Sequence, residues 1–305
     1  MLADRIADDL LLPMEMLQYL VRSAPHRYRV YRIPKHSGSG FRTIAQPARE
    51  VRMLQYWVMK NIFPELPVHS AATAYCAGKN IRDNCAPHAA NPYLLKLDFR
   101  NFFPSIKAGD FIQYAAEARH LPFDPPELRM LACILFRRPK GKKEMVLSVG
   151  APSSPYLSNA LLYGFDDEMS RYCESRGIVY TRYADDMAFS MQDKAKRLEV
   201  LHKVRDVLRQ MPFPRLTLND RKTVFASKAH RRSITGLTLA NDGRISLGRE
   251  RKRQISAQLH HFVNGKLPQE ERGKLRGLLS YVKDIEPAFF TRMAEKYGRE
   301  KIAGI

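Results

Sequence analysis

The chain has 305 residues, of which 45% are hydrophobic. This length and composition favour a globular protein with a sizeable core and exclude an intrinsically disordered one. The 51 lysines and arginines exceed the 31 aspartates and glutamates, so the net charge is +20. Such a charge favours a polyanionic partner, either nucleic acid or an acidic membrane surface, although a merely basic soluble protein is the ordinary alternative.

No run of residues is long and apolar enough to span a bilayer, and the N-terminal segment lacks the basic start of a signal peptide. The four cysteines lie far apart without a C-x-x-C pair, which favours reduced thiols over a zinc site or a disulfide framework. We therefore expect a cytoplasmic protein with no membrane partner.

The first 63 residues predict helices around one hairpin. Residues 1–24 are helical, with Pro13 opening a second helix. Residues 28–47 predict a β-hairpin whose turn is the segment HSGSG at 36–40. Residues 48–63 predict a helix, because Leu54, Val58 and Ile62 recur at intervals of four.

The central part predicts strands and helices in alternation. Residues 93–99 are a short apolar run typical of a buried strand. Residues 108–138 predict a helical stretch broken near Pro122, Pro125 and Pro126, and the segment GAPSSP at 150–155 precedes a helix over 156–175. Residues 178–191 predict two strands around a tight Asp-Asp turn, the second strand alternating as a half-buried strand does.

The last third predicts short strands and then basic helices. Strands are expected within 216–225 and 231–248, and helices from residue 249 onward. A boundary is expected near 240–248, which divides the chain into residues 1–240 and 241–305.

Three aspartates are candidate metal ligands. Asp185 and Asp186 occupy a turn between two apolar strands, and Asp98 ends another apolar strand. An Asp-Asp turn is ordinarily a solvated loop tip, but carboxylates that close buried strands are costly unless something compensates their charge. Two Mg²⁺ ions would remove the repulsion among them and would suit an in-line phosphoryl transfer.

Four segments in this order resemble the motifs of reverse transcriptases. They are LDFRNFF (97–103), GAPSSP (150–155), YADD (183–186) and NDRKT (219–223). The resemblance implies an α+β right-hand polymerase fold, with fingers and palm in residues 1–240 and a helical thumb in 241–305. It also implies that Asp98, Asp185 and Asp186 are catalytic and bind two Mg²⁺ ions.

The same resemblance implies a pocket for an incoming dNTP. Arg42 would clamp the triphosphate through its bidentate guanidinium, with Lys35 as a weaker candidate. Phe103 would be an aromatic gate against the ribose 2′-hydroxyl. The pocket would also include Phe99, Gly150, Pro152, Ser153, Tyr183 and Lys222. The ordinary alternatives are a surface arginine for Arg42 and a core phenylalanine for Phe103.

One position departs from the family pattern. Reverse transcriptases usually have glutamine before the glycine of the GAPSSP segment, whereas this chain has Val149 before Gly150. Valine has no side-chain hydrogen bond to offer the sugar of the nucleotide, so nucleotide affinity or fidelity is expected to differ. The metal chemistry is unaffected.

Two further segments resemble retron enzymes in particular. Asn84-Cys85-Ala86-Pro87-His88 is similar to the retron N-A-x-x-H element, and Ile234-Thr235-Gly236 is similar to the V-T-G element. The resemblance implies that Asn84, His88, Thr235 and Gly236 contact a structured RNA. For Asn84 and His88, a local cap and a core histidine are the ordinary alternatives.

The basic segment after residue 248 resembles a thumb that tracks an RNA–DNA duplex. The candidate RNA-binding residues are Arg249, Arg251, Lys252, Arg253 and Arg276. A solvated charged face is the ordinary alternative, but acids are sparse between 249 and 266.

Retron enzymes copy a bound noncoding RNA (msr/msd) from a guanosine 2′-hydroxyl into branched, RNA-linked DNA (msDNA), and they commonly act in anti-phage defence with an effector protein encoded nearby. The resemblance implies this function here. The alternatives are another bacterial reverse transcriptase, of the diversity-generating or abortive-infection type, and a catalytically silent RNA-binding scaffold.

Overall fold

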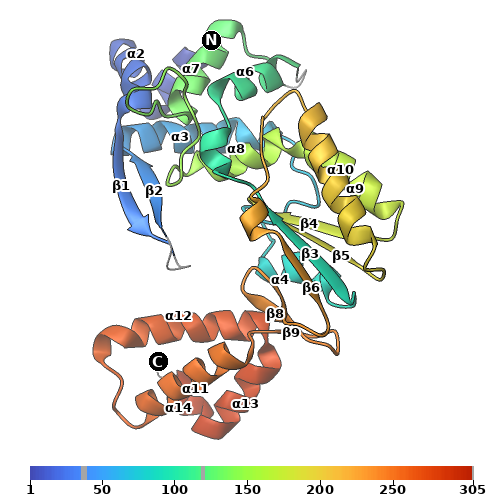
Figure 1. The fold of residues 1–305 in the computed structure, drawn as a ribbon. Coiled ribbons are helices and arrows are strands. Elements are labelled where there is room, and N and C mark those ends of the chain that lie inside the picture. The colour runs from blue at the N-terminus through green and yellow to red at the C-terminus, as the bar shows by residue number, and fades with distance from the viewer. Residues whose placement is uncertain (36–39, 118–120, 304–305) are drawn as a thin grey trace.

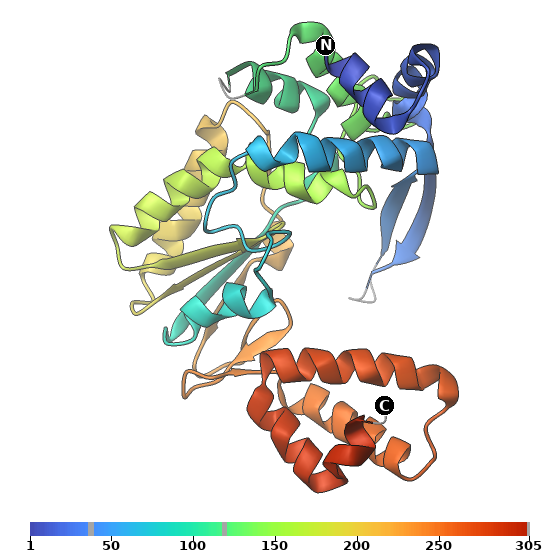
Figure 2. The ribbon, with the colours of Figure 1, turned by 180° about the vertical axis from the view of Figure 1, so that it is seen from behind.

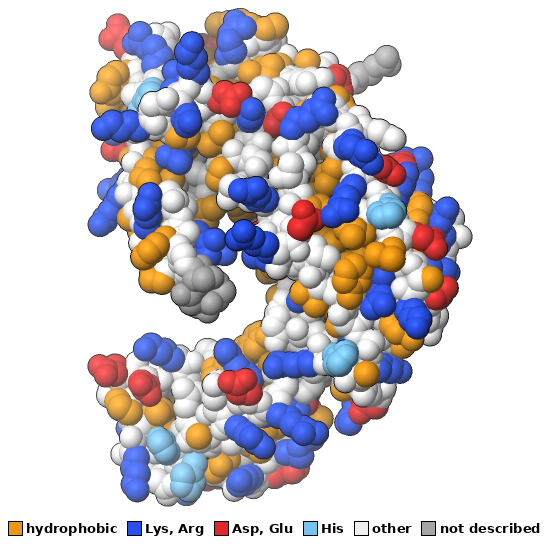
Figure 3. All heavy atoms as spheres, in the orientation of Figure 1, with side chains coloured by type: hydrophobic (Ala, Val, Ile, Leu, Met, Phe, Trp, Pro, Cys, Tyr) orange, Lys and Arg blue, Asp and Glu red, His pale blue; other side chains and the backbone are white. Residues whose placement is uncertain are grey.

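The computed structural model describes residues 1–35, 40–117 and 121–303. The molecule is C-shaped, with an open side between the β1–β2 hairpin above and a helical bundle below (Figure 1, Figure 3). The mixed helix-and-sheet architecture is that of a right-hand polymerase, as predicted. None of the helices in the described ranges is both long and apolar enough to cross a membrane.

The upper part of the molecule corresponds to the predicted fingers. Its elements are α1 (Leu2–Leu10), α2 (Met14–Ser23), η1 (Ala24–His26), β1 (Tyr28–Pro34), β2 (Phe41–Pro47), α3 (Arg49–Asn61), η2 (Phe63–Glu65), α6 (Ala108–Glu117), α7 (Pro125–Leu135) and α8 (Ser153–Leu161). Pro13 directly precedes α2, and Leu54 and Val58 of α3 are buried, both as the sequence predicts. The hairpin is confirmed by its antiparallel pairing, whereas residues 36–39 of the predicted turn lie outside the described residues.

The prolines divide the segment 108–138 into α6 and α7 as expected. Asp124 begins α7 because its carboxylate accepts a hydrogen bond from the backbone N–H of Glu127, at 2.8 Å. Glu127 returns a bond to the N–H of Asp124, and Pro125 takes the first helical position, where no N–H is needed.

The central part is a palm built on a four-stranded antiparallel sheet in the order β4-β5-β3-β6. Its elements are α4 (Ile81–Cys85), η3 (Ala86–His88), β3 (Tyr93–Asp98), α5 (Phe102–Ser105), α9 (Tyr163–Glu174), β4 (Val179–Tyr183), β5 (Asp186–Met191), α10 (Lys196–Gln210), η4 (Asp220–Lys222) and β6 (Val224–Ser227). Helices α9 and α10 cover one face of the sheet (Figure 1). Helix α4 packs on the opposite face.

The structure corrects the expectation of a half-buried second strand in the Asp-Asp hairpin. Residues 187–191 of β5 are buried on both faces. Met187 and Phe189 enter the main core with α9 and α10, whereas Ala188 and Ser190 face α4 and η3, where Ser190 bonds His88. Small side chains alternate with large ones here because the second face is covered closely, not because it meets water.

Two other sequence expectations are wrong in detail. The helix expected over 156–175 is two helices, α8 and α9, which meet at Leu162, and α8 already begins at Ser153. The strand expected over 216–225 is confined to its end, since β6 begins at Val224. The preceding residues form a single bridge between Leu218 and Phe99 and then the 3-10 turn η4.

The lower part of the molecule joins a small sheet to a helical bundle. Its elements are β7 (Arg232–Ile234), β8 (Leu237–Leu239), β9 (Ile245–Ser246), α11 (Arg249–Val263), α12 (Gln269–Ile285), α13 (Pro287–Tyr297) and α14 (Arg299–Ala303). A second hydrophobic core contains Ile234 and Leu237 together with Ile255 and Leu279 of the bundle. The boundary expected near 240–248 therefore lies within a shared core.

Candidate active site

The three predicted aspartates meet at one end of the palm sheet. Asp98 ends β3 and Asp186 begins β5, and these two residues are direct partners in the antiparallel register. Asp185 lies in the connecting turn, and its carbonyl accepts a hydrogen bond of 3.2 Å from the N–H of Phe99. The sheet register thus brings together two carboxylates, Asp98 and Asp186, that are 88 residues apart in the sequence.

Two carboxyl groups of the cluster have raised pKa values. Burial and the charge of Asp98 raise the pKa of Asp185 above its ordinary value, although the charges of Lys222 and Arg42 act in the opposite direction. Loss of contact with water, together with Asp185 and Asp98, raises the pKa of Asp186 to about 7. Burial is the larger cause of both shifts, and repulsion among the clustered carboxylates adds to it.

Lys222 holds the third carboxylate. Its Nζ donates to Oδ2 of Asp98 at 2.7 Å, and Asn219 Nδ2 lies 3.3 Å from Oδ1. Partial burial lowers the pKa of Lys222, but the hydrogen bond to Asp98 and the neighbouring carboxylates outweigh this effect and raise it overall. A lysine predicted at the palm floor therefore neutralises part of the cluster.

The donor set fits divalent metal ions. Carboxylate oxygens are the ligands that Mg²⁺ prefers, and a bound cation would relieve the repulsion that raises the pKa values of Asp185 and Asp186. Over the described ranges, no three His, Cys, Asp or Glu side chains form a ready-made cage for a metal ion. An incomplete set of protein ligands is compatible with Mg²⁺, which commonly completes its coordination with substrate phosphates and water.

A buried ion pair supports the turn that carries Asp185. Arg182 and Asp166 are both fully buried and are joined by two hydrogen bonds of 2.8 and 2.5 Å. Arg182 Nη1 also donates to the carbonyl of Ala184, at 3.0 Å, and to Oδ1 of Asn159, at 3.1 Å. Asn159 and Tyr180 complete the network, because Tyr180 donates to Asp166 at 2.7 Å and Asn159 is bonded to the carbonyl of Ala74.

The turn itself is under conformational constraint. Ala184 has φ of 56°, which is unusual for a residue with a side chain, and its carbonyl is the one held by Arg182. No sequence motif predicted a role for Arg182, Asp166 or Asn159. Only the adjacency of an arginine to the YADD segment could have drawn attention to Arg182, since Asp166 and Asn159 lie on helices with no pattern that links them to it.

The fingers hairpin places Arg42 in the field of the aspartates. Arg42 lies on β2 opposite Ile33 of β1, it is exposed, and its charge acts on both Asp185 and Tyr75. Lys35 follows β1, and its backbone N–H bonds the carbonyl of Gly40 at 3.0 Å. Tyr75, which sequence reasoning missed, has its ring 6.4 Å from that of Tyr183 and is 44% exposed.

The segment around Gly150 connects fingers and palm. The N–H of Ala45 on β2 bonds the carbonyl of Val149 at 2.8 Å. Gly150 has φ of 114°, and a Cβ at this position would lie 3.1 Å from the side chain of Ile44 and 3.2 Å from the carbonyl of Ala45. Only glycine fits this close approach without strain.

Two side chains predicted to belong to the nucleotide pocket are buried. Phe99 is 2% exposed and stacks on Phe102 with 5.6 Å between ring centroids, while Ser153 is fully buried in α8. Neither side chain is therefore exposed to a nucleotide in this structure, and a role for them in shaping the pocket stays a prediction. Pro152 precedes α8 as its N-cap, and Phe103 remains partly exposed beside Phe102.

The expectation that Asn84 and His88 contact RNA through their side chains is also wrong in this structure. His88 is fully buried, and its ring nitrogens bond Ser190 and Thr181 at 2.8 Å each. Burial lowers its pKa to about 3, so the ring is neutral. Asn84 is 1% exposed, and its Oδ1 accepts from Thr181 at 2.7 Å.

The other RNA candidates lie nearer the surface. Thr235 and Gly236 form the two-residue turn between β7 and β8 with φ values of 46° and 83°, and Gly236 is exposed. Arg249, Arg251, Arg253 and Arg276 are exposed on α11 and α12. Lys252 differs, because it forms an ion pair with Glu286 and lies over the ring of Phe289, so its charge is partly used inside the bundle.

Comparison with known proteins establishes the family. Residues 33–239 match the family described as reverse transcriptase (RNA-dependent DNA polymerase). The chain is 41% identical over 285 residues to the retron Ec83 reverse transcriptase of Escherichia coli, which covers 93% of this chain and 91% of that protein. The chain belongs to the retron-type reverse transcriptases. It is 30% identical to the retron Ec86 reverse transcriptase of Escherichia coli, over 95% of this chain and 88% of that protein.

A solved structure shares the fold at lower identity. The foamy viral protease-reverse transcriptase dRH, solved in complex with ds DNA, matches with a TM-score of 0.50 and 15% identity, covering 91% of this chain and 43% of that chain. The present chain is thus an RNA-directed DNA polymerase of a retron system, in a family that uses divalent metal ions and acts on nucleic acid.

Proposed function

We propose that this retron-type reverse transcriptase copies a bound, structured noncoding RNA into a short DNA that stays joined to the RNA. Synthesis starts from a guanosine 2′-hydroxyl of that RNA, and the branched product serves anti-phage defence together with an effector protein encoded nearby. The observation that carries the proposal is the 41% identity to a retron enzyme over 93% of the chain.

Asp98, Asp185 and Asp186 would hold two Mg²⁺ ions. The bound ions supply the positive charge that activates the attacking hydroxyl and stabilises the leaving pyrophosphate. The chain itself orders the reacting groups: the Asp98–Asp186 register fixes the carboxylates, and Lys222 holds Asp98 in place. In the reaction the primer oxygen bonds the α-phosphorus of a dNTP, the bond to pyrophosphate breaks, and the hydroxyl proton is lost to solvent or a nearby base.

The nucleotide enters between the hairpin and the palm. Arg42 grips its phosphates, Tyr183 lies at the primer end, and the Gly150 backbone leaves room where a side chain would not fit. The exposed arginines of α11 and α12, with the Thr235–Gly236 turn, contact the RNA. In support of this proposal, lysine and arginine side chains lie both above and below the open side of the molecule in Figure 3.

Replacing Phe103 by alanine is expected to let the enzyme incorporate ribonucleotides. The ring is partly exposed at the start of α5, where it would clash with a ribose 2′-hydroxyl. Discrimination between dNTP and rNTP should fall by about one to two orders of magnitude, measured as the ratio of kcat/KM values in primer extension. The matched control is Phe102→Ala, since Phe102 is buried. If wild type and Phe103→Ala discriminate equally between dNTP and rNTP, Phe103 is not the gate.

The metal-free protein is expected to lose stability as the pH rises from about 4 to about 7. The pKa of Asp186 is raised from 3.8 to about 7, so the folded protein binds this proton more tightly than the unfolded chain does. The resulting stabilisation is fully present below pH 3.8 and disappears as the pH passes 7. Mg²⁺ should accordingly raise the unfolding temperature more at pH 8 than at pH 5.5, because it binds the ionised carboxylates. A Mg²⁺ effect independent of pH, or unchanged in Asp186→Asn, would contradict this.

The proposed product can be tested directly. The gene is expressed with its flanking DNA, nucleic acid is extracted from the purified enzyme, and the product is digested with ribonuclease and with a 2′,5′-debranching enzyme. We expect a short DNA whose mobility changes with each treatment. A short DNA that lacks a branched RNA link, or the absence of co-purified DNA, would favour a diversity-generating or abortive-infection enzyme. No dNTP incorporation with Mg²⁺ on any primer would favour a silent RNA-binding scaffold.

A further inference from the structure

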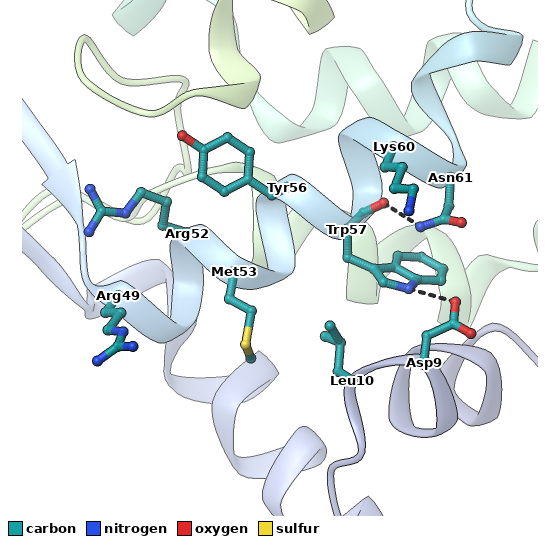
Figure 4. Close-up of a pocket in the computed structure, with 9 residues that line it drawn as sticks. All are labelled: Asp9, Leu10, Arg49, Arg52, Met53, Tyr56, Trp57, Lys60 and Asn61. Atoms are coloured by element: carbon teal, nitrogen blue, oxygen red, sulfur yellow. Dashed lines mark hydrogen bonds between the residues drawn. The ribbon is translucent and has the colours of Figure 1, made fainter.

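A groove of about 840 Å³ lies on the fingers, between the end of α1 and one side of α3 (Figure 4). Figure 2 shows α3, in blue, in front on this face, and none of the three aspartates of the palm lines the groove. Its lining residues are Asp9, Leu10, Arg49, Arg52, Met53, Tyr56, Trp57, Lys60 and Asn61.

The groove is positively charged by side chains that have no partner. Arg49, Arg52 and Lys60 form neither an ion pair nor a side-chain hydrogen bond within residues 1–35, 40–117 and 121–303. The one acid in the lining is Asp9, whose carboxylate already accepts a bond of 2.8 Å from Trp57 Nε1. Three uncompensated cations in one concavity favour an anionic occupant.

An aromatic ring lies in line with these cations. Arg52, Tyr56 and Lys60 follow one another at intervals of four along α3, so they share one side of the helix and span about 12 Å. Tyr56 is 55% exposed although it is a large ring, and Trp57 forms part of the floor. A flat exposed ring between two cations is the arrangement that stacks a base while its neighbouring phosphates are held.

We propose that this groove binds a single-stranded segment of nucleic acid, with a base stacked on Tyr56 and phosphates held by Arg49, Arg52 and Lys60. An acidic peptide would satisfy the cations but would leave the exposed ring without a matching flat partner. A continuous duplex would keep its bases inside and would be recognised by backbone and shape. The groove goes beyond the proposed function, since neither metal binding nor priming involves it.

The test uses the full chain with its cleft first filled by a primer–template duplex. A fluorescent 12-nucleotide oligouridylate is titrated and its anisotropy measured, while the fluorescence of Trp57, the chain's single tryptophan, reports whether the oligonucleotide reaches the groove. Tyr56→Leu should weaken binding about tenfold by loss of stacking. The double variant Arg49→Gln/Lys60→Gln should reduce the slope of log affinity against log salt by about 1.4, because two single-strand phosphate contacts are lost.

The matched control is Lys194→Gln, which changes an exposed lysine between β5 and α10 of the palm that does not line the groove. It should leave the anisotropy, the salt slope and the Trp57 signal unchanged. All variants should extend a preformed primer–template at the wild-type rate, and this activity separates failure of the groove from failure of the proposed function. Wild-type affinity in both groove variants would overturn the proposal. So would a polyglutamate peptide whose binding, unlike that of the oligonucleotide, depends on Tyr56 and Lys60.

Discussion

Replacing Asp185 by asparagine is expected to abolish DNA synthesis while RNA binding stays within a factor of a few. The substitution keeps the size of the side chain but removes one carboxylate from the end of β4 and β5, where burial and Asp98 already raise its pKa. Several kcal/mol of metal-derived stabilisation would be lost, which corresponds to a decrease of about a thousandfold or more in rate. In our proposal RNA binding involves the exposed arginines of α11 and α12, so it should persist.

The measurement pairs primer extension at saturating dNTP and Mg²⁺ with a filter-binding assay for the noncoding RNA. Asp167→Asn is a matched control, because Asp167 is a partly exposed acid on α9 whose one ion pair within the described ranges is with Arg171. It should retain full activity. Substantial polymerisation by Asp185→Asn would remove the assignment of the three aspartates, and loss of RNA binding would indicate that the variant had misfolded.

Replacing Arg182 by methionine is expected to lower the free energy of unfolding by about 3–5 kcal/mol. The substitution leaves the fully buried carboxylate of Asp166 without its cation, and breaking one side of a buried ion pair is strongly destabilising. The carbonyl of Ala184 also loses its hydrogen-bond donor, so the turn that carries Asp185 is no longer fixed by a bond to the buried side chain. Activity at a permissive temperature should therefore fall as well, through a weaker response to Mg²⁺.

The double variant Arg182→Met/Asp166→Leu separates the two effects. Apolar replacement of both partners of a buried pair is often close to neutral for stability, so unfolding by urea should recover most of the loss. The Mg²⁺ concentration for half-maximal activity should remain raised, because neither new side chain can donate to Ala184. Recovery of both properties together would mean that the pair contributes only to packing.

The sequence was informative wherever local chemistry decides the structure. The buried run at 93–98, the hairpin around the Asp-Asp turn and the prolines that separate α6 from α7 are all in their predicted places. Strand patterning also predicted that Asp98 and Asp185 end apolar segments. The hydrophobic pattern did not predict burial correctly where other elements pack on the second face of a strand. The alternation in β5 indicated solvent on one side, whereas α4 and η3 cover that side.

The retron-like segment at 84–88 illustrates the same limit. Its residues are present as predicted, but burial commits His88 and Asn84 to hydrogen bonds with β4 and β5. No local pattern distinguishes a histidine that contacts RNA from one that hydrogen-bonds side chains of the palm sheet, because in both cases a polar residue lies in a short turn. The distinction depends on which strands pack over that turn.

The sequence by itself determined the family, the charge of the partner and the identity of the three acids, because each of these depends on residue types and their order along the chain. The tertiary structure decided how the acids meet, which lysine holds Asp98, and that a buried arginine supports the turn that carries Asp185. These facts depend on the antiparallel register of β3 and β5 and on helices that pack beneath them. The basic groove on α3 likewise becomes visible only when α1 lies beside that helix.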